Sequence, residues 1–347
     1  MSEDMKRIAI IGAGVAGLAC ARVLAAHGHD VKVFDKGRGP GGRMSTRRAQ
    51  TPLGEVRFDH GAQYFTARSA GFTSEVERLI DAGAVGKWEG ALVRLSKDGK
   101  STPLANETLY VGQPGMNDVV RALAAGLWVD WGVRVKTIAP VGPLWALISE
   151  SETTLGTFDQ IICAVPAEQV APLLDDCAPT LAKLGAAITS LPCWAGMFVF
   201  DRPLCIPFNA MRLVDHPVVD FIAVNHSKPG RGDLASYVVH ARADWSARQL
   251  EDAPDVIAEQ LVQALTAFSD DAPNLIYSVA HRWRFARVEV QDGIGCGFDE
   301  AAGIGLCGDY LSGPRVESAW ISGHQLGLRM TGMAGKSKTQ VQNAGRE

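Results

Sequence analysis

Hydrophobic runs and polar breaks divide the N-terminal part of the chain into a strand, a helix and a second strand. Residues 6–11 form a short apolar run, and a helical pattern continues from the glycines at 12, 14 and 17 to about residue 27. Gly28 ends that helix, and residues 31–34 form a second apolar run that closes on Asp35. This order predicts the start of a Rossmann-like parallel sheet.

Further along, the pattern predicts elements of two kinds. We expect a helix over 69–82, a turn and helix over 112–127, and a strand over 133–141 that returns to the first sheet. Buried strands are expected over 158–170, broken by Pro166, and over 303–309, followed by an amphipathic helix over 314–330. Between residues 170 and 290, short alternating runs predict a mostly antiparallel sheet with helices on one face.

The order of these elements predicts an α/β protein whose nucleotide-binding domain is interrupted by a second, α+β domain. The cofactor domain is expected to comprise residues 1–68, 105–166 and 286–335, and the substrate domain residues 69–104 and 167–285. The last twelve residues, 336–347, are expected to form a disordered tail.

Composition narrows the class of protein. A formal charge of −4 and 47% hydrophobic residues indicate a globular protein that binds neither nucleic acid nor membranes. The chain has seven cysteines, an odd number, with no C-x-x-C pair, which predicts scattered thiols in a reducing cytoplasm and no zinc site. His27 and His29 lie in a helix-to-strand loop without further ligands, so no metal site is expected.

The first glycine motif has the residue types that a bound dinucleotide requires. Gly12 permits the tight turn, Gly14 allows close approach of the pyrophosphate, and Gly17 allows helix and strand to pack closely. The helix N-terminus offers free N–H groups to the phosphates, and Asp35 can accept hydrogen bonds from a ribose. These features predict dinucleotide binding, but by themselves they do not distinguish a nicotinamide from a flavin nucleotide.

A second glycine-rich stretch distinguishes them. Gly41-Gly42-Arg43 follows Asp35 by a few residues, and flavin-binding members of this superfamily carry Gly-Gly-Arg at this place. Two glycines allow backbone torsions that are closed to other residues, and Arg43 can contact a phosphate with two N–H groups. The motif therefore favours a flavin. Arg47 and Arg48 lie beyond it, and we expect them either to be solvated or to lie near the pocket mouth for an anionic nucleotide substrate.

Three motifs together resemble the renalase family, most closely its bacterial branch: FDKGRGPGGRMS, FDHGAQYFTAR and GLCGDYLSGPRVESAWISG, with YVGQPGM between them. The resemblance extends from about residue 6 to residue 330. It implies a GR2-type FAD-binding domain with the p-hydroxybenzoate hydroxylase-like fold, within the flavin amine oxidase superfamily, and non-covalent FAD. Ser318 departs from the motif, which usually has glycine there.

The resemblance also implies which residues contact the cofactor. Ala16, Arg43, Ala62 and Gln63 would touch FAD, and the residues from Gly308 to the start of the final helix would lie against its pyrophosphate, ribityl and pyrimidine parts. With the first motif, the residues expected to bind FAD are Gly12, Gly14, Ala16, Gly17, Asp35, Lys36, Gly42, Arg43, Met44, Ala62, Gln63, Val135, Gly308, Asp309, Arg315, Val316 and Glu317.

Several side chains are candidates for the substrate pocket, each with a purely structural alternative. Tyr64, His240 and Trp320 are the candidates for residues beside the reacting ring. Tyr64 and Trp320 could equally be core, and for His240 a core histidine with satisfied hydrogen bonds is the favoured alternative. Gln63, Asn225, Arg282 and Trp283 are the candidates for substrate binding, and ordinary salt bridging is the alternative for Arg282.

By its family resemblance the chain is expected to be a cytoplasmic oxidase of misreduced nicotinamides, 2- or 6-dihydro-NAD(P), that gives NAD(P)+ and reduces molecular oxygen to hydrogen peroxide. Hydride loss from a dihydropyridine yields an aromatic ring, so no side chain need remove a proton. Two alternatives are a flavin amine oxidase and a non-catalytic flavin-binding redox sensor. Amine oxidases usually place a lysine on a substrate-domain strand, and the only lysines between residues 137 and 335 are Lys183 and Lys228.

Overall fold

The computed structural model describes residues 5–271, 273–289 and 293–333. Contacts between Cα atoms divide them into two compact units, each built from separate stretches of chain. Unit 1 comprises residues 1–42, 123–189 and 288–347, and unit 2 comprises residues 43–122 and 190–287, as far as these are described. The predicted disordered tail, residues 336–347, lies outside the described residues.

This division differs from the expected domains at three longer stretches, each for a visible reason, and residues 286–287 also fall in unit 2. Residues 43–68 join unit 2 because the β3–β4 hairpin they form is bonded to its residues through Asp59, Lys228 and Arg231. Residues 105–122 join unit 2 as well, since β8 pairs with β5. Residues 167–189 join unit 1 because Leu174 and Leu181 belong to its core.

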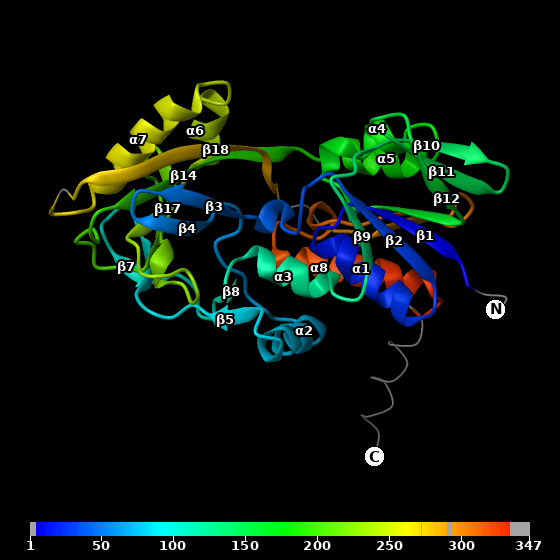
Figure 1. Ribbon diagram of the computed structural model, residues 1–347, viewed down its shortest axis with the longest axis horizontal. Coiled ribbons are helices and arrows are strands. Elements are labelled where there is room, and N and C mark those ends of the chain that lie inside the picture. The colour runs from blue at the N-terminus through cyan, green and yellow to red at the C-terminus, as the bar shows by residue number, and fades with distance from the viewer. Residues whose placement is uncertain (1–4, 272, 290–292, 334–347) are drawn as a thin grey trace, which may run out of the picture. The chain divides into compact units, whose positions relative to one another are not determined.

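Unit 1 is built on a six-stranded sheet with the strand order β19-β20-β13-β1-β2-β9 (Figure 1). All neighbouring pairs run parallel except β19 and β20, which agrees with the predicted Rossmann-like arrangement. Its strands and helices are β1 Arg7–Ile11, α1 Val15–Ala26, β2 Asp30–Asp35, β9 Trp128–Trp131, β10 Val135–Val141, β11 Leu144–Ser149, β12 Thr154–Phe158, β13 Gln160–Cys163, α4 Ala171–Leu174, α5 Pro179–Ala186, β19 Gly297–Asp299, β20 Ile304–Leu306 and α8 Val316–Met330.

Helices α1 and α8 lie side by side beneath this sheet (Figure 1). Glycine allows their close approach, because a Cβ at Gly323 would lie 1.8 Å from the carbonyl oxygen of Ala16. Both helices were predicted, α1 from the glycine motif and α8 from the apolar pattern of residues 314–330. Their contact fixes the start of α8 relative to the glycine turn that precedes α1.

The strand predicted over 133–141 exists as β10, but the prediction that it returns to the first sheet is wrong. β10 forms a separate three-stranded antiparallel sheet with β11 and β12, and the first sheet instead takes β9, which pairs with β2. A tight turn at Gly142, whose φ is +59°, leads the chain straight from β10 into β11. This local hairpin replaces the long-range pairing.

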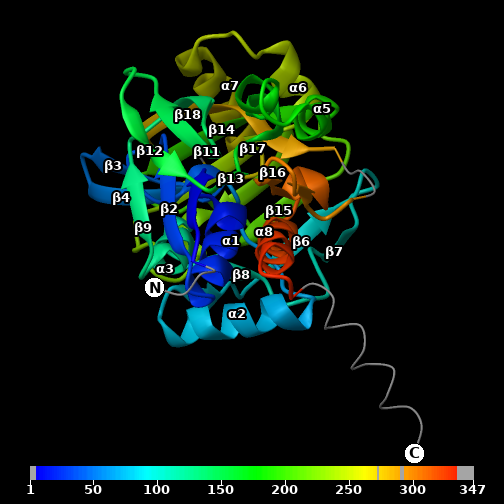
Figure 2. The same ribbon diagram turned by 90° about the vertical axis from the view of Figure 1, so that its right-hand side faces the viewer.

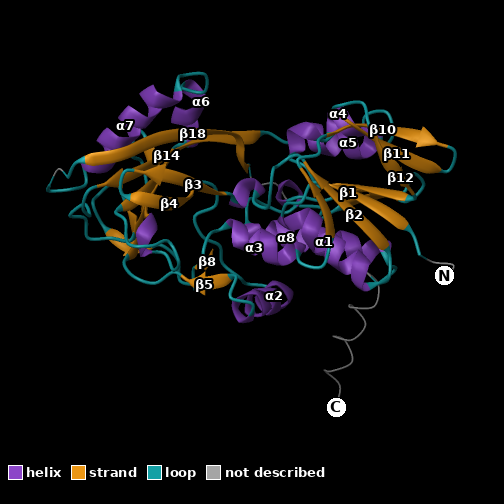
Figure 3. Cartoon of the chain, viewed as in Figure 1, coloured by secondary structure: helices purple, strands orange, loops and turns teal. Residues whose placement is uncertain are grey.

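Unit 2 contains a seven-stranded sheet with the order β18-β14-β17-β16-β15-β6-β7. The pairs from β14 to β15 and the β6–β7 pair are antiparallel, and the β15–β6 pair is parallel. Figure 3 shows the strands in orange, with β14 and β18 labelled. The predicted mostly antiparallel sheet is therefore confirmed. The elements of unit 2 are β3 Thr46–Thr51, β4 Gly54–Asp59, α2 Ala70–Asp81, β5 Val85–Lys87, β6 Leu92–Leu95, β7 Ser101–Pro103, β8 Tyr110–Gly112, β14 Ser190–Phe200, β15 Ala210–Leu213, β16 Val219–Val224, β17 Ser236–Ala241, α6 Ala243–Arg248, α7 Pro254–Thr266 and β18 Leu275–Val288, whose last residue is assigned to unit 1. Helix α3, Asn117–Ala124, crosses the boundary.

Helices α6 and α7 cover one face of this sheet (Figure 2). Side chains that alternate along β14 and β17, such as Phe198, Tyr237 and Val239, form a buried core with Leu261 of α7. The residues between them, including His240, point to the other face of the sheet. That face therefore carries His240. Among the described residues, no helix has the length and apolar character needed to cross a membrane.

Candidate functional site

The glycine turn between β1 and α1 is shaped for a phosphate. Gly12 has a φ of +109°, and a Cβ there would lie 2.5 Å from the Ala164 carbonyl oxygen, while a Cβ at Gly17 would lie 2.0 Å from the Gly12 carbonyl oxygen. A Cβ at Gly14, by contrast, would meet nothing within 4 Å. Gly14 caps α1 without any side-chain hydrogen bond, and the first turn contains no acid. The positive end of the helix dipole is therefore open to an anion.

The carboxylate of Asp35, at the end of β2, is held by backbone amides. Its Oδ2 accepts a hydrogen bond from the Ala13 N–H, and its Oδ1 accepts one from the Gly37 N–H, both at 2.7 Å. Each oxygen retains a lone pair that a ribose hydroxyl could use. Lys36 extends instead to the side chain of Gln169, at 2.9 Å. Val135 is buried at the start of β10, in the core of unit 1.

Unit 1 also holds the Gly308–Asp309 turn and the beginning of α8. The hydroxyl of Ser322, in α8, accepts the Gly308 N–H at 2.9 Å and so fixes this turn to the helix. Glu317 is 4% exposed in the first turn of α8, and its carboxylate lies 3.5 Å from the guanidinium of Arg315. Trp320 is buried, with its ring stacked on His324 at 4.5 Å. Ser318 is buried as well.

In unit 2, the turn after β4 is held against Arg43. The Ala62 N–H donates to the Arg43 carbonyl at 2.9 Å, and a Cβ at Gly61 would lie 2.1 Å from the same oxygen. Met44 is buried beside Arg43. Gln63, 6% exposed, donates from Nε2 to the carbonyl oxygens of Asp59 and Gly61. Its side-chain amide is therefore held in one orientation.

A buried charge cluster of Asp59, Lys228 and Arg231 fixes the other end of Gln63, and it was not predicted from the sequence. Lys228 donates from Nζ to the Gln63 Oε1 at 3.0 Å and lies 3.3 Å from Asp59 Oδ2, which also accepts from Arg231 at 2.6 Å. Burial raises the pKa of Asp59, but the charges of Lys228 and Arg231 outweigh burial and lower it below its ordinary value. Burial lowers the pKa of Lys228 to about 8. The Ser-Lys-Pro-Gly context of Lys228 is typical of a surface loop, so only the tertiary structure reveals this role.

Beside Gln63 the structure brings together three imidazoles and an indole. His240 Nε2 lies 3.2 Å from Gln63 Nε2 and 3.1 Å from the His60 carbonyl oxygen, which also accepts from Trp283 Nε1 at 2.9 Å. The ring of His60 stacks on Trp283 and meets His281 edge to face at 4.8 Å. Burial lowers the pKa of His60 to about 3 and that of His240 to about 4. Both imidazoles are therefore neutral at pH 7.

Tyr64 joins the polar face of the sheet in unit 2. Its ring lies 5.9 Å from that of Phe221 on β16, and the guanidinium of Arg212 lies 5.3 Å from the same Phe221 ring. The structure thus brings three of the pocket candidates, Tyr64, Gln63 and His240, to one face of this sheet. Trp283 is connected to this group through His60, whose carbonyl oxygen lies within hydrogen-bond distance of both Trp283 Nε1 and His240 Nε2.

Two substrate candidates lie elsewhere in unit 2. Alternation along β18 puts Arg282 on the opposite face from Trp283, and its guanidinium bonds to the Leu250 carbonyl and to Glu251 at 3.0 Å. Asn225 is fully buried, and its Nδ2 donates to the Arg57 carbonyl and the Ser236 hydroxyl. The polar atoms of Arg282 and Asn225 are therefore bonded within the protein, and the expected contacts of these two residues with substrate remain predictions.

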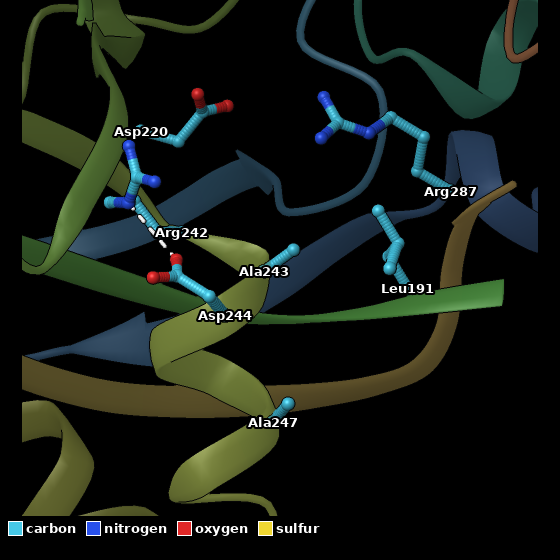
Figure 4. Close-up of a pocket in the computed structure, with 7 residues that line it drawn as sticks. All are labelled: Leu191, Asp220, Arg242, Ala243, Asp244, Ala247 and Arg287. Carbon is cyan, nitrogen blue, oxygen red and sulfur yellow. Dashed lines mark hydrogen bonds and ion pairs between the residues drawn. The ribbon is translucent and has the colours of Figure 1, made fainter. Parts of the chain in front are cut away.

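A cavity of about 380 Å³ lies in unit 2 where β14, β16 and β18 meet the start of α6 (Figure 4). Two of its carboxylates have cationic partners: Asp220 lies 2.8 Å from Arg212, and Asp244 lies 3.0 Å from Arg242. Arg287 extends toward it from β18, and none of the described residues forms an ion pair with it. The residues that line it are Leu191, Asp220, Arg242, Ala243, Asp244, Ala247 and Arg287.

Two models of known protein families match the chain. Residues 10–82 match the NAD(P)-binding Rossmann-like domain, and residues 92–325, more than half of the chain, match the family described as flavin containing amine oxidoreductase. The chain belongs to the flavin-containing amine oxidoreductase family. This membership confirms the expected fold class, the expectation of an oxidoreductase and that of bound flavin.

The curated relatives are similar over short stretches of the chain. A zeta-carotene-forming phytoene desaturase of Myxococcus xanthus is 60% identical over 44 residues, 13% of this chain and 8% of the relative. Hydroxyneurosporene desaturase of Rubrivivax gelatinosus is 40% identical over 70 residues, 20% of this chain and 13% of the relative. The matched part of the chain thus spans only a small fraction of the length of these relatives.

Solved structures are similar over nearly the whole chain. A putative protoporphyrinogen oxidase from Exiguobacterium sp. 255-15 superposes with a TM-score of 0.73 at 13% identity, covering 95% of this chain and 99% of the other. A putrescine oxidase bound to putrescine gives a TM-score of 0.68 at 12% identity, covering 94% and 99%. At these identities the similarity establishes the fold.

The residues of unit 1 fit the dinucleotide form of the flavin, FAD. The open space at Gly14, the uncapped N-terminus of α1 and the carboxylate of Asp35 supply what a pyrophosphate and a ribose require. Unit 1 also contributes Ala16, Lys36, Gly42 and the Gly308–Glu317 segment to the expected set, and unit 2 contributes Arg43, Met44, Ala62 and Gln63. The individual contacts of these residues with FAD remain predictions.

Proposed function

We propose that the protein is an FAD-dependent oxidase of dihydronicotinamide nucleotides, which converts 2- or 6-dihydro-NAD(P) to NAD(P)+ in the cytoplasm. Bound FAD supplies the hydride acceptor, and molecular oxygen takes up the two electrons with two protons to give hydrogen peroxide. Motifs that resemble the renalase family support this substrate class: FDKGRGPGGRMS, FDHGAQYFTAR and GLCGDYLSGPRVESAWISG.

The observation that carries the proposal is that the imidazoles of His60 and His240, which lie beside Gln63, are neutral. His60 and His240 have pKa values of about 3 and 4, so neither is charged at pH 7, and the ring of Trp283 is apolar. A dihydropyridine that loses a hydride becomes aromatic, so the protein need only bind and orient it. Tyr64, Gln63, His240 and Trp283 are suited to that task.

The positions of the lysines, together with the neutral imidazoles, disfavour amine oxidation. The only lysine of residues 190–287 is Lys228, and its ammonium group is held by Asp59 and Gln63 and lies 4.8 Å from the Trp88 ring centroid. Lys183 is exposed on α5, in unit 1. Neither lysine takes the place on a substrate-domain strand that amine oxidases use. Neutral imidazoles also offer no negative charge to attract a substrate ammonium group.

Within unit 1, the start of α8 supports flavin chemistry. The N–H groups of its first turn, at Val316 and Glu317, carry the positive end of the helix dipole, which would stabilise negative charge on a pyrimidine ring placed there. Arg315, 3.5 Å from the carboxylate of Glu317, offsets the opposing charge of that acid. Trp320, if it faces the ring, would add stacking.

Oxygen consumption tests the proposed activity. The purified holoenzyme is expected to consume one oxygen for each 2- or 6-dihydro-NAD and to release NAD+ and hydrogen peroxide in equal amounts. Ordinary NADH, with the hydride at a different ring carbon, and a panel of primary and secondary amines serve as controls. Steady oxygen uptake with an amine, and none with either dihydro isomer, would identify an amine oxidase instead.

A pH profile separates the same alternatives. Because His60 and His240 titrate at about pH 3 and 4, the rate of flavin reduction by a dihydronicotinamide is expected to change less than about twofold between pH 5 and pH 7. An amine substrate must instead lose an ammonium proton, so its rate would rise with pH. Stopped-flow absorbance of the flavin measures both rates. A steep rise between pH 5 and pH 7 with the dihydronicotinamide contradicts the proposed role of a neutral cluster.

A further inference from the structure

Arg47 lies on the inner face of the β3–β4 hairpin, toward β18. It is paired in register with Phe58 on β4, so the two side chains share one face of the hairpin. Phe58 is fully buried and stacks on Tyr277 of β18, with ring centroids 5.9 Å apart. His281 lies two residues past Val279 on the same face of β18 as Tyr277. Arg47 is thereby directed to the His281 side of this strand.

The guanidinium of Arg47 has no carboxylate partner among the described residues. None of the described residues forms an ion pair or a hydrogen bond with its guanidinium, whereas many arginines of unit 2, such as Arg212 and Arg242, have an acidic partner. Its charge acts on the neighbouring imidazoles: burial lowers the pKa of His281, and the charge of Arg47 lowers it further. The same charge contributes to the low pKa of His60.

A second polar group near Arg47 also lacks a partner. His60 is 7% exposed, and its Nδ1 is buried without a hydrogen-bond partner among the described residues. A buried polar atom without a partner costs free energy, and a bound ligand can relieve that cost. Arg47, His60 and His281 together offer one cation and imidazole nitrogens beside the indole of Trp283. This combination suits an anionic group attached to an aromatic base.

We propose that Arg47 binds a phosphate group of the nicotinamide nucleotide substrate and so selects nucleotides over nucleosides. The inference rests on the proposed function, because it assigns a contact within the substrate that this function names. A guanidinium can donate two parallel N–H groups to phosphate oxygens, and no nearby carboxylate of the described chain competes for them. Arg47 is then a specificity-determining residue, with no part in hydride transfer itself.

Equilibrium binding tests the inference with two ligands that differ by one phosphate. Isothermal calorimetry on the oxidised holoenzyme compares nicotinamide mononucleotide with nicotinamide riboside. The wild type is expected to bind the mononucleotide at least about tenfold more tightly. Arg47→Gln is expected to weaken mononucleotide binding by about 10- to 100-fold and to change riboside binding less than about twofold. Arg47→Lys keeps the positive charge but loses the two parallel N–H groups of the guanidinium. Its affinity for the mononucleotide should therefore lie between those of the wild type and Arg47→Gln.

Arg48→Gln is the matched control. Arg48 is the next residue of β3, is exposed, and points to the opposite face of the hairpin, so its loss should leave the preference for the mononucleotide unchanged. Equal or undetectable binding of the two ligands by the wild type, or a preference retained in Arg47→Gln, overturns the inference. Turnover is measured separately. A wild type that prefers the mononucleotide but oxidises no dihydronicotinamide would refute the proposed function and leave the phosphate site standing.

Discussion

Gly14→Val is expected to give a folded protein that has lost most of its affinity for FAD. Gly14 has a φ of −78° and a ψ of 179°, which valine adopts readily, and a Cβ there meets no protein atom within 4 Å. The added side chain would instead occupy the space that a pyrophosphate needs against the first turn of α1. Loss of about two charge-assisted hydrogen bonds weakens FAD binding by at least about 100-fold.

The dissociation constant of FAD, measured by quenching of flavin fluorescence on binding to apoprotein, checks this prediction. Thermal unfolding of the two apoproteins shows whether Gly14→Val is as stable as the wild type. Gly17→Ala is the contrasting variant, since its Cβ would lie 2.0 Å from the Gly12 carbonyl oxygen, and it should destabilise the fold itself. Unchanged FAD affinity in Gly14→Val would show that the pyrophosphate does not lie at this turn.

Asp59→Asn is expected to destabilise the protein by about 3–5 kcal/mol, because it leaves two buried cations without their counter-charge. Asp59 is fully buried and pairs with Lys228 and Arg231, and its Oδ1 accepts from the Met116 N–H at 3.0 Å. Gln63 would also lose the support that Lys228 gives it, so we expect the pocket beside it to loosen.

The free energy of unfolding in urea measures this effect. Asp98→Asn is the control, because Asp98 pairs with Lys100 at the surface and its removal should not measurably change stability. Should Asp59→Asn be too unstable to purify, Lys228→Met removes one charge and tests the same cluster, with Lys228→Arg as the conservative variant. A loss below about 1 kcal/mol for Asp59→Asn would show that the cluster is not a structural centre of unit 2.

Local sequence patterns were sufficient to predict much of unit 1. The glycine turn, α1, β2 and α8 could be predicted because their signals lie within a few residues: three spaced glycines, an acid at a strand end and a 3.6-residue apolar period. Sheet membership could not be read this way. Whether residues 133–141 join the first sheet or pair with the next strand in sequence depends on contacts across the chain. In the structure they pair with β11 in a local hairpin.

Unit 2 shows which parts of a site cannot be predicted from sequence. Arg282 and Trp283 could be named as candidates from the sequence, but the face on which each residue lies depends on the sheet into which β18 is built. Because side chains alternate along β18, His281 and Trp283 lie on one face of the sheet and Arg282 and Arg284 on the other. Both arginines form ion pairs with Glu251 there. The partnership of Asp59 with Lys228 joins residues far apart in sequence, and neither residue has a local signal for burial.

Anaerobic reduction of the flavin is a direct test of whether dihydronicotinamide nucleotides are the substrates of this protein. The yellow holoenzyme is mixed without oxygen with 2-dihydro-NAD, 6-dihydro-NAD, ordinary NADH or an amine, and the flavin absorbance is followed through a single turnover. We expect rapid bleaching by at least one of the dihydro isomers, with one NAD+ formed per flavin, and little or no bleaching by NADH or amines. Bleaching by amines alone would contradict it.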